Sequence, residues 1–104
     1  MQVREYIYSI TIRQRYHYPI EKHFTDFTQA RATAVNLLRG KLKENESIIS
    51  FKEDVWTTDN IISHRITMYA WGLNRRRVHC VKCYSVTIVG YPPEPKVSDP
   101  IFAH

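Results

Sequence analysis

Two strands and the turn between them are encoded in residues 60–93, NIISHRITMYAWGLNRRRVHCVKCYSVTIVGYPP. In each half, apolar side chains alternate with polar ones, which is the pattern of a strand that buries one face. The apolar series are Ile62, Ile66, Met68 and Ala70, with His64 on the same side, and then Val78, Cys80, Tyr84, Val86 and Ile88, with Lys82 as the exception. Turn-forming residues from Gly72 to Arg75 separate the two series, so we expect a hairpin.

The same alternation predicts two more strands earlier in the chain. The first places Tyr6, Tyr8, Ile10 and Ile12 on one side and Glu5, Ser9, Thr11 and Arg13 on the other. It bends or ends at residues 16–19, because Pro19 cannot donate a backbone hydrogen bond to a neighbouring strand. The second contains Ile49, Phe51 and Val55, and Thr58-Asp59-Asn60 is a tight-turn signal after it.

One helix is predicted between these two strands. Asp26 followed by Gln29 indicates a capping box, in which the Asp26 carboxylate accepts free backbone N–H groups. The apolar residues Phe27, Ala30, Ala34, Leu37, Leu38 and Leu42 recur at helical spacing and form one stripe. We expect the helix to end near Asn45 and to lie across one face of a sheet.

These elements define an α+β fold in the order β-α-β-β-β. We expect a four-stranded antiparallel sheet with one helix packed on one face, in a single domain over residues 1–90, and an extended, proline-rich tail over residues 91–104. This order of elements is similar to that of cystatin-like and monellin-like proteins, although the inhibitory motifs of cystatins are missing. The similarity concerns architecture alone and implies no function.

A single helix covers one face of the sheet, so the other face meets solvent or a partner. The side chains expected there are Ser9, Thr11 and Arg13, then Ser63, Arg65, Thr67, Tyr69 and Trp71, then His79, Cys83, Ser85 and Thr87. Hydroxyls, cations and two large rings suit phosphate contact combined with base stacking. Two alternatives fit the same rings: they pack against a second subunit, or the tail covers Trp71 with Ile101 and Phe102.

Positive charge is concentrated rather than spread along the chain. The protein has 15 Lys and Arg against 10 Asp and Glu, a net charge of +5 and a pI near 9.4. Residues 60–93 contain Arg65, Arg75, Arg76, Arg77 and Lys82 but no Asp or Glu, and a second basic stretch contains Arg13, Arg15, His17, Lys22 and His23. Such fields attract polyanions. Whether the two stretches adjoin depends on the strand order, which the sequence does not give.

The cysteines and histidines give no catalytic or metal-binding motif. Cys80 and Cys83 stand three residues apart in a strand and point to opposite faces, so we expect free thiols, no metal and no cofactor. Ser-His-Asp, P-loop and Gly-rich phosphate motifs are missing. With no signal-peptide core and no apolar window long enough to span a bilayer, we expect a cytoplasmic protein.

The sequence therefore favours a small, non-catalytic binding protein that docks on a polyanionic target, which would be RNA, DNA or a nucleoprotein. The candidate binding residues are Arg13, Arg15, Arg65, Tyr69, Trp71, Arg75, Arg76, Arg77 and Lys82. Proteins of this size and type are often accessory proteins of phages and plasmids. One alternative is an inhibitor or adaptor that docks on another protein through an exposed sheet face or edge, and a homodimer is a further candidate assembly. The other is a small metal-free ribonuclease that uses residues such as His17, His64, His79, Arg65 and Tyr69.

Overall fold

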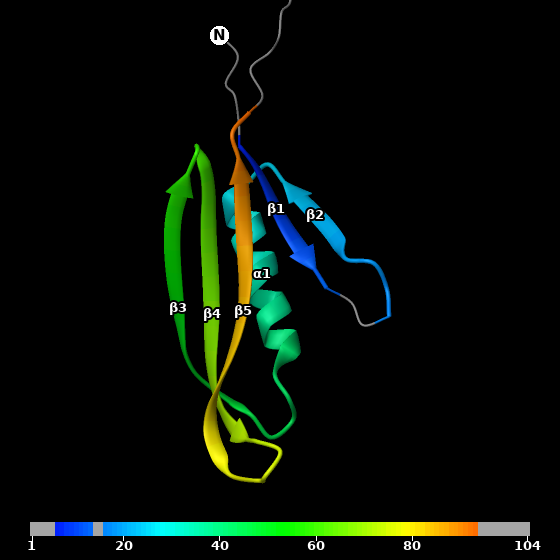
Figure 1. Cartoon of the computed structure of the whole chain (residues 1–104), viewed down its shortest axis with the longest axis vertical. Coiled ribbons are helices and arrows are strands. Elements are labelled where there is room, and N and C mark those ends of the chain that lie inside the picture. Colours follow the sequence, from blue (N-terminus) through cyan, green and yellow to red (C-terminus); the bar gives the residue numbers. More distant parts are fainter. Residues whose placement is uncertain (1–5, 14–15, 94–104) are drawn as a thin grey trace, which may run out of the picture.

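The computed structural model describes residues 6–13 and 16–93. One helix and five strands follow one another as β1 (Ile7–Ile12), β2 (Ile20–Phe24), α1 (Phe27–Lys41), β3 (Ser47–Thr58), β4 (Ile61–Leu73) and β5 (His79–Tyr91). All neighbouring strands pair antiparallel, and the sheet has the order β2-β1-β5-β4-β3. The helix lies behind this sheet in Figure 1.

The predicted α+β fold with a helix on an antiparallel sheet is confirmed, but the sheet has five strands rather than four. The missing strand is β2, which pairs with β1 from Ile20 opposite Ile12 to Phe24 opposite Tyr8. Its sequence, IEKHF, is too short and too polar to show an alternating pattern, and only Phe24 is partly buried. β5 also extends through Tyr91, one residue beyond the predicted domain boundary.

The helix begins where the sequence predicts it. Asp26 is the N-cap, and its Oδ1 accepts a hydrogen bond of 2.9 Å from the backbone N–H of Thr28. The helix ends at Lys41 with Leu42 as the C-cap, so the predicted end near Asn45 was too late. Leu42 takes extended backbone angles there, and its N–H bonds to the carbonyl of Arg39.

The core lies between α1 and the inner strands of the sheet. Its largest fully buried side chains are Ile10, Leu38, Ile66, Met68 and Ile88. Ala30 and Ala34, also fully buried, have no bulk beyond Cβ, so the helix can approach the sheet closely. The helix packs on β1, β2, β4 and β5, whereas it reaches β3 through the Arg31 side chain, which forms an ion pair with Glu53. β3 is therefore a strand that the helix leaves largely uncovered.

The two hairpin turns differ in how well the sequence located them. Asp59 and Asn60 have φ angles of 52° and 65° and join Thr58 to Ile61 in a two-residue turn, as predicted. The next turn was placed two residues too early. Leu73 still pairs with His79, and Gly72 lies inside β4 opposite Cys80.

Two predictions remain, one on the C-terminal tail and one on membrane-spanning segments. The extended tail, with Ile101 and Phe102 over Trp71, lies outside the described residues apart from the first few positions after β5. Within the described part of the chain, no helix is long and apolar enough to cross a membrane.

Candidate functional site

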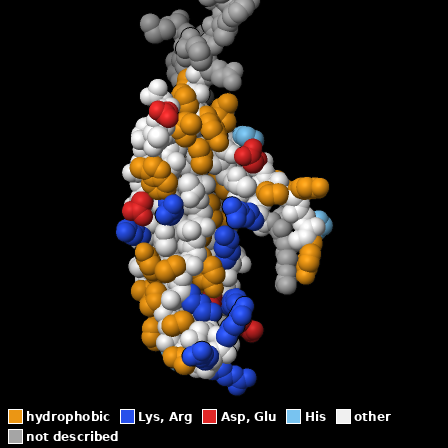
Figure 2. All heavy atoms as spheres, in the orientation of Figure 1, with side chains coloured by type: hydrophobic (Ala, Val, Ile, Leu, Met, Phe, Trp, Pro, Cys, Tyr) orange, Lys and Arg blue, Asp and Glu red, His pale blue; other side chains and the backbone are white. Residues whose placement is uncertain are grey.

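The candidate site is built on the sheet surface that α1 does not cover, which we call the open face. Register fixes its membership, because paired residues of neighbouring strands share a face. On β4 and β5 it includes Ser63, Arg65, Thr67, Tyr69, Trp71, His79, Val81, Cys83, Ser85 and Thr87. All of them except Val81 are side chains that we expected there from the alternation, and none of them carries a carboxylate. Figure 2 looks onto this face.

The aromatic side chains of the open face are partly engaged with neighbours. Trp71 stacks on His79 with ring centroids 5.7 Å apart and planes 10° from parallel, yet 46% of its surface stays exposed. The Arg65 guanidinium lies 5.0 Å from the ring centroid of Trp56 on β3, a cation–π contact. Tyr69 is half-buried between them along β4. Trp71 and Trp56 each contact a neighbouring side chain, and both keep a large part of their surfaces exposed to solvent.

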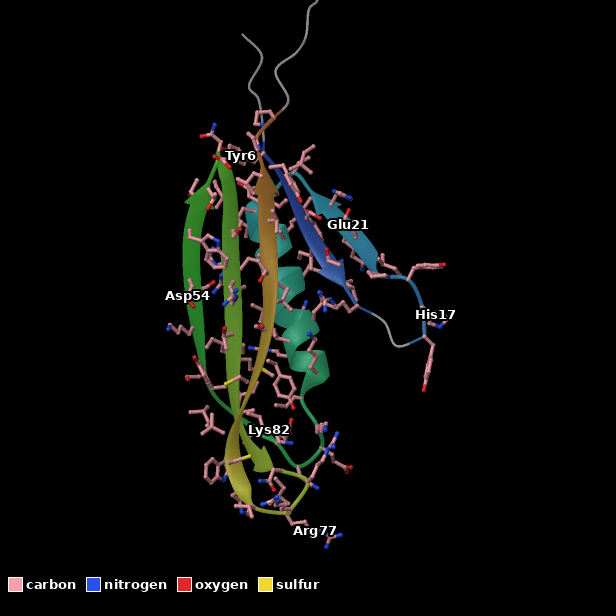
Figure 3. The ribbon with its side chains drawn as sticks, in the orientation of Figure 1. Tyr6, His17, Glu21, Asp54, Arg77 and Lys82 are labelled. Carbon is pink, nitrogen blue, oxygen red and sulfur yellow. The ribbon has the colours of Figure 1, made fainter. Side chains whose placement is uncertain are left out.

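The three consecutive arginines occupy an ordered turn at one end of the sheet, and we call Asn74–Val78 the arginine turn. The Asn74 side chain shapes it: Oδ1 accepts hydrogen bonds from the backbone N–H groups of Arg76 (2.8 Å) and Val78 (3.0 Å). Arg77 has a φ of 59°, and its N–H bonds to the Asn74 carbonyl. All three arginines are exposed, and Figure 3 shows Arg77 pointing away from the sheet.

A cleft of about 500 Å³ opens between β1 and β5. The two strands pair only between Ile7–Ile10 and Ile88–Tyr91, and beyond Ile10 they diverge (Figure 1). The cleft is lined by Thr11, Ile12, Arg13, Leu37, Lys41, Ser85, Val86, Thr87 and Val89, a set that includes two cations and no acid. Its β5 wall carries Ser85 and Thr87, so the cleft joins the open face.

The strand order thus answers the question that the sequence left open. β1 lies beside β5, so the second basic stretch, through Arg13, adjoins the acid-free strands β4 and β5. In Figure 2, Lys and Arg side chains gather over the β4–β5 turn and along the line between β5 and the β1–β2 hairpin. Sequence reasoning missed the cleft and Lys41, because no local pattern shows that two strands far apart in the chain diverge over a helix.

Two acidic residues, Glu53 and Glu46, form ion pairs on the helix side of the sheet. Glu53 receives two hydrogen bonds from Arg31, at 2.7 and 3.1 Å, and its Oε1 lies 3.0 Å from Nε2 of His64. The hydrogen bonds from Arg31, followed by that from His64, lower the pKa of Glu53 to about 2. Asp54 is the exception on β3: it lies on the open face opposite Arg65 and 3.8 Å from Lys52.

A second carboxylate, Glu46, is buried beneath the end of the hairpin. The Tyr84 hydroxyl donates to its Oε1 at 2.6 Å, the Lys43 backbone N–H donates at 3.0 Å, and Lys82 Nζ lies 2.9 Å from Oε2 as an ion pair. These contacts lower the pKa of Glu46 to about 2, and the carboxylate in turn raises the pKa of Tyr84 to about 12. Gly72 makes the room, since a Cβ there would lie 2.7 Å from Cγ of Glu46.

The structure brings most, but not all, of the candidate binding residues together. Arg65, Tyr69 and Trp71 lie on the open face, the arginine turn lies at its end, and Arg13 lies in the adjoining cleft. Lys82 lies on the opposite, helix-side face, where it neutralises Glu46 and is only 22% exposed. Arg15 falls outside the described residues.

The cysteines and histidines are dispersed over both faces. Cys80 pairs with Gly72 on the helix side and Cys83 with Tyr69 on the open face, so their side chains point apart as the spacing predicts. His64 packs on Phe27 at 5.0 Å on the helix side, whereas His79 stacks on Trp71. Within residues 6–13 and 16–93, no group of three His, Cys, Asp or Glu side chains is placed to hold a metal ion.

Comparison of this chain with protein-family models, with curated proteins and with solved structures found no match. The fold and the site geometry are therefore the basis for any statement about function.

Proposed function

We propose that this protein is a non-catalytic binding protein that docks through its open face on a polyanion, with single-stranded nucleic acid as the preferred target. One observation carries the proposal. The acid-free face of β4 and β5, with exposed Trp71, lies between two basic features: the arginine turn at its end and the cleft with Arg13 and Lys41 at its side.

Each part of this surface matches one part of a nucleic-acid strand. Arginine forks bind phosphate oxygens through two parallel hydrogen bonds, and the hydroxyls of Thr67, Ser85 and Thr87 can also donate to phosphate or sugar. Flat rings stack on unpaired bases, whereas the bases of a duplex stay stacked on one another. A half-exposed indole beside free cations therefore favours a single strand over a duplex.

The ion pairing of the acids on the helix side supports the same proposal. Glu46 and Glu53 lie on the helix side and are neutralised there by Lys82 and Arg31, so their charge does not oppose a phosphate on the open face. The acid on the open face of β3, Asp54, lies beside Lys52 and opposite Arg65. In the cell, such a protein would act in the cytoplasm, in contact with RNA, DNA or a nucleoprotein.

The test replaces the arginine turn. The variant Arg75→Gln, Arg76→Gln, Arg77→Gln keeps the turn length and the Asn74 hydrogen bonds, which go to backbone groups. We expect weaker binding to a labelled single strand of any sequence, and a salt slope reduced by about one unit for each arginine that binds a phosphate in the wild type. Wild type should also bind the single strand more tightly than a duplex of the same length.

The matched control removes two cations that lie off the open face, Lys22→Gln with Arg39→Gln, both exposed. It should leave the salt slope unchanged, which separates a local site from a general effect of net charge. If wild type binds neither strand form even at low salt, the nucleic-acid proposal is wrong, and docking on a protein partner replaces it.

A further inference from the structure

β3 has an outer edge with which no described residue pairs. It is the last strand in the sheet order, so half of its backbone N–H and C=O groups point away from β4. Its large apolar side chains are exposed: Ile48, Ile49, Phe51, Val55 and Trp56 keep between 38% and 59% of their surfaces. A long exposed edge with apolar side chains is a template for pairing with another strand.

Near the middle of β3, two side chains of opposite charge flank Glu53 at equal separation. The segment Phe51-Lys52-Glu53-Asp54-Val55 has an apolar residue at each end and opposite charges on either side of Glu53. Lys52 and Asp54 lie on the open face, whereas Phe51, Glu53 and Val55 lie on the helix side. Read from the other end, the segment has the same order of apolar and charged positions, with the charges on either side of Glu53 exchanged.

We propose that a second copy of this chain pairs with β3 edge to edge, antiparallel, across a two-fold axis at Glu53. In this register Lys52 faces the partner's Asp54 and Asp54 faces the partner's Lys52. On the helix side, Phe51 faces the partner's Val55 and the reverse. The inference is independent of the proposed nucleic-acid binding.

Symmetry limits the registers that compete with this one. A two-fold axis joining two edge strands in one sheet runs perpendicular to the sheet, so each copy keeps its helix on the same side. Paired residues share a face, which requires the axis to pass through a residue rather than between two. Centres at Lys52 and Asp54 place like charges directly opposite each other, which is destabilising, and they form no pair of opposite charges that offsets the repulsion.

A two-fold axis at Phe51 or at Val55 brings no two opposite charges into register. An axis at Phe51 places Lys52 opposite the partner's Ser50, and an axis at Val55 places Asp54 opposite the partner's Trp56. Only the axis at Glu53 gives two complementary pairs on the open face and two apolar pairs on the helix side. The bulge between Ile48 and Ser50 confines the regular pairing to the part of β3 from Ser50 onwards.

The two Glu53 side chains that meet at the axis are already neutralised within each copy. Arg31 holds each carboxylate with two hydrogen bonds, and His64 adds a third contact. Their mutual repulsion is thereby screened by groups on the same side of the sheet. In the dimer the two sheets become one continuous sheet, and both open faces point to the same side.

Charge reversal on the edge tests this pairing. Lys52→Asp gives an acidic edge and Asp54→Lys a basic edge, and each turns both cross-copy ion pairs into like-charge contacts. Sedimentation equilibrium over a wide range of protein concentration should show dimers for wild type and a dissociation constant raised at least about tenfold for each variant. Both side chains are exposed, so melting curves should confirm that the variants fold.

Mixing the two variants gives the sharpest result. An acidic edge facing a basic edge restores both ion pairs, so an equimolar mixture should form heterodimers at concentrations where each variant alone is monomeric. Lys22→Asp, on the opposite edge strand β2, is the matched control and should dimerise like wild type. Wild type that stays monomeric at all concentrations overturns the proposal. So does dimerisation that the edge variants leave unchanged, or a mixture that does not associate.

Discussion

At the scale of single residues, Glu46 shows how the fold accommodates a buried carboxylate. Three donors surround it, from Tyr84, Lys43 and Lys82, and the missing side chain of Gly72 gives it space. A buried charge is tolerated when it is paired and hydrogen-bonded. The arrangement also fixes the end of the hairpin, because Lys82 and Tyr84 are on β5 and Gly72 is on β4.

Gly72→Ala tests this arrangement. The new Cβ would lie 2.7 Å from Cγ of Glu46, whose carboxylate end is held in place, so we expect a loss of about 1–3 kcal/mol in the free energy of unfolding. Urea denaturation measures it. Gly40→Ala is the control: nothing lies within 4 Å of its Cβ, and Ala in a helix should stabilise by up to about 1 kcal/mol. A neutral Gly72→Ala would show that Glu46 is not packed there.

Stability should fall at both ends of the pH scale. Glu46 and Glu53 have a pKa of about 2 in the folded state against an ordinary 4.5, so the unfolded chain takes up protons first as the pH drops from 4.5 towards 2. Tyr84, with its pKa raised from 10.0 to about 12, keeps its proton in the folded state while the unfolded chain loses it. The unfolding free energy should therefore decline below pH 4.5 and again above pH 10.

The variant Tyr84→Phe is the control for the decline of the unfolding free energy above pH 10. In Tyr84→Phe the decline between pH 10 and pH 12 that Tyr84 causes should disappear, while the acid-side contribution of Glu53 remains. Denaturant midpoints measured across the pH range give both slopes. An alkaline decline of the same size in Tyr84→Phe and wild type would contradict the hydrogen bond to Glu46.

At the scale of elements, the helix contributes most of the burial on its side of the sheet. Leu38 is fully buried between α1 and the strands, so Leu38→Ala should cost about 2–5 kcal/mol of unfolding free energy. Leu37 precedes it in the helix and is only partly buried, so Leu37→Ala should lower the unfolding free energy by less than Leu38→Ala does. A loss below about half a kcal/mol for Leu38→Ala, as for a surface substitution, would mean that another face of the helix is buried.

The elements that sequence predicted well are those with strong periodicity. Alternation in β1, β4 and β5 and the apolar stripe of α1 follow from burial of one face, and Asp26 and the Asp59-Asn60 turn follow from local backbone chemistry. Register then placed Arg65, Tyr69 and Trp71 on the open face as expected. These properties depend on neighbours within a few positions, which a sequence displays directly.

What sequence did not predict depends on contacts between distant positions. β2 has almost no buried side chain, so burial leaves no pattern in it. Glu46 and Tyr84 stand 38 positions apart, and their contact arises only when β3, β4 and β5 are assembled. One local signal pointed to it, because Lys82 interrupts an apolar series; Gly72 was assigned to the turn, and only the structure places it within β4. A cation in that series indicates a partly buried charge that needs a partner of opposite charge.

At the scale of the whole molecule, the fold separates two functions of charge. The helix side carries ion pairs that hold the structure together, Arg31–Glu53 and Lys82–Glu46. The open face carries rings, hydroxyls and cations without a carboxylate on β4 or β5. This separation is the basis of the docking surface that we propose on the open face.

The most direct test of this docking surface is to titrate the isotope-labelled protein with a short single-stranded oligonucleotide and to follow its amide and indole N–H resonances by NMR. The account predicts that shifts concentrate on β4, β5 and the arginine turn, include the Trp71 indole, and extend to Arg13 beside the cleft. Residues on the outward side of α1, such as Ala32 and Asn36, should stay unchanged. Shifts confined to α1 and the outer edge of β3, or no shifts at low salt, would contradict it.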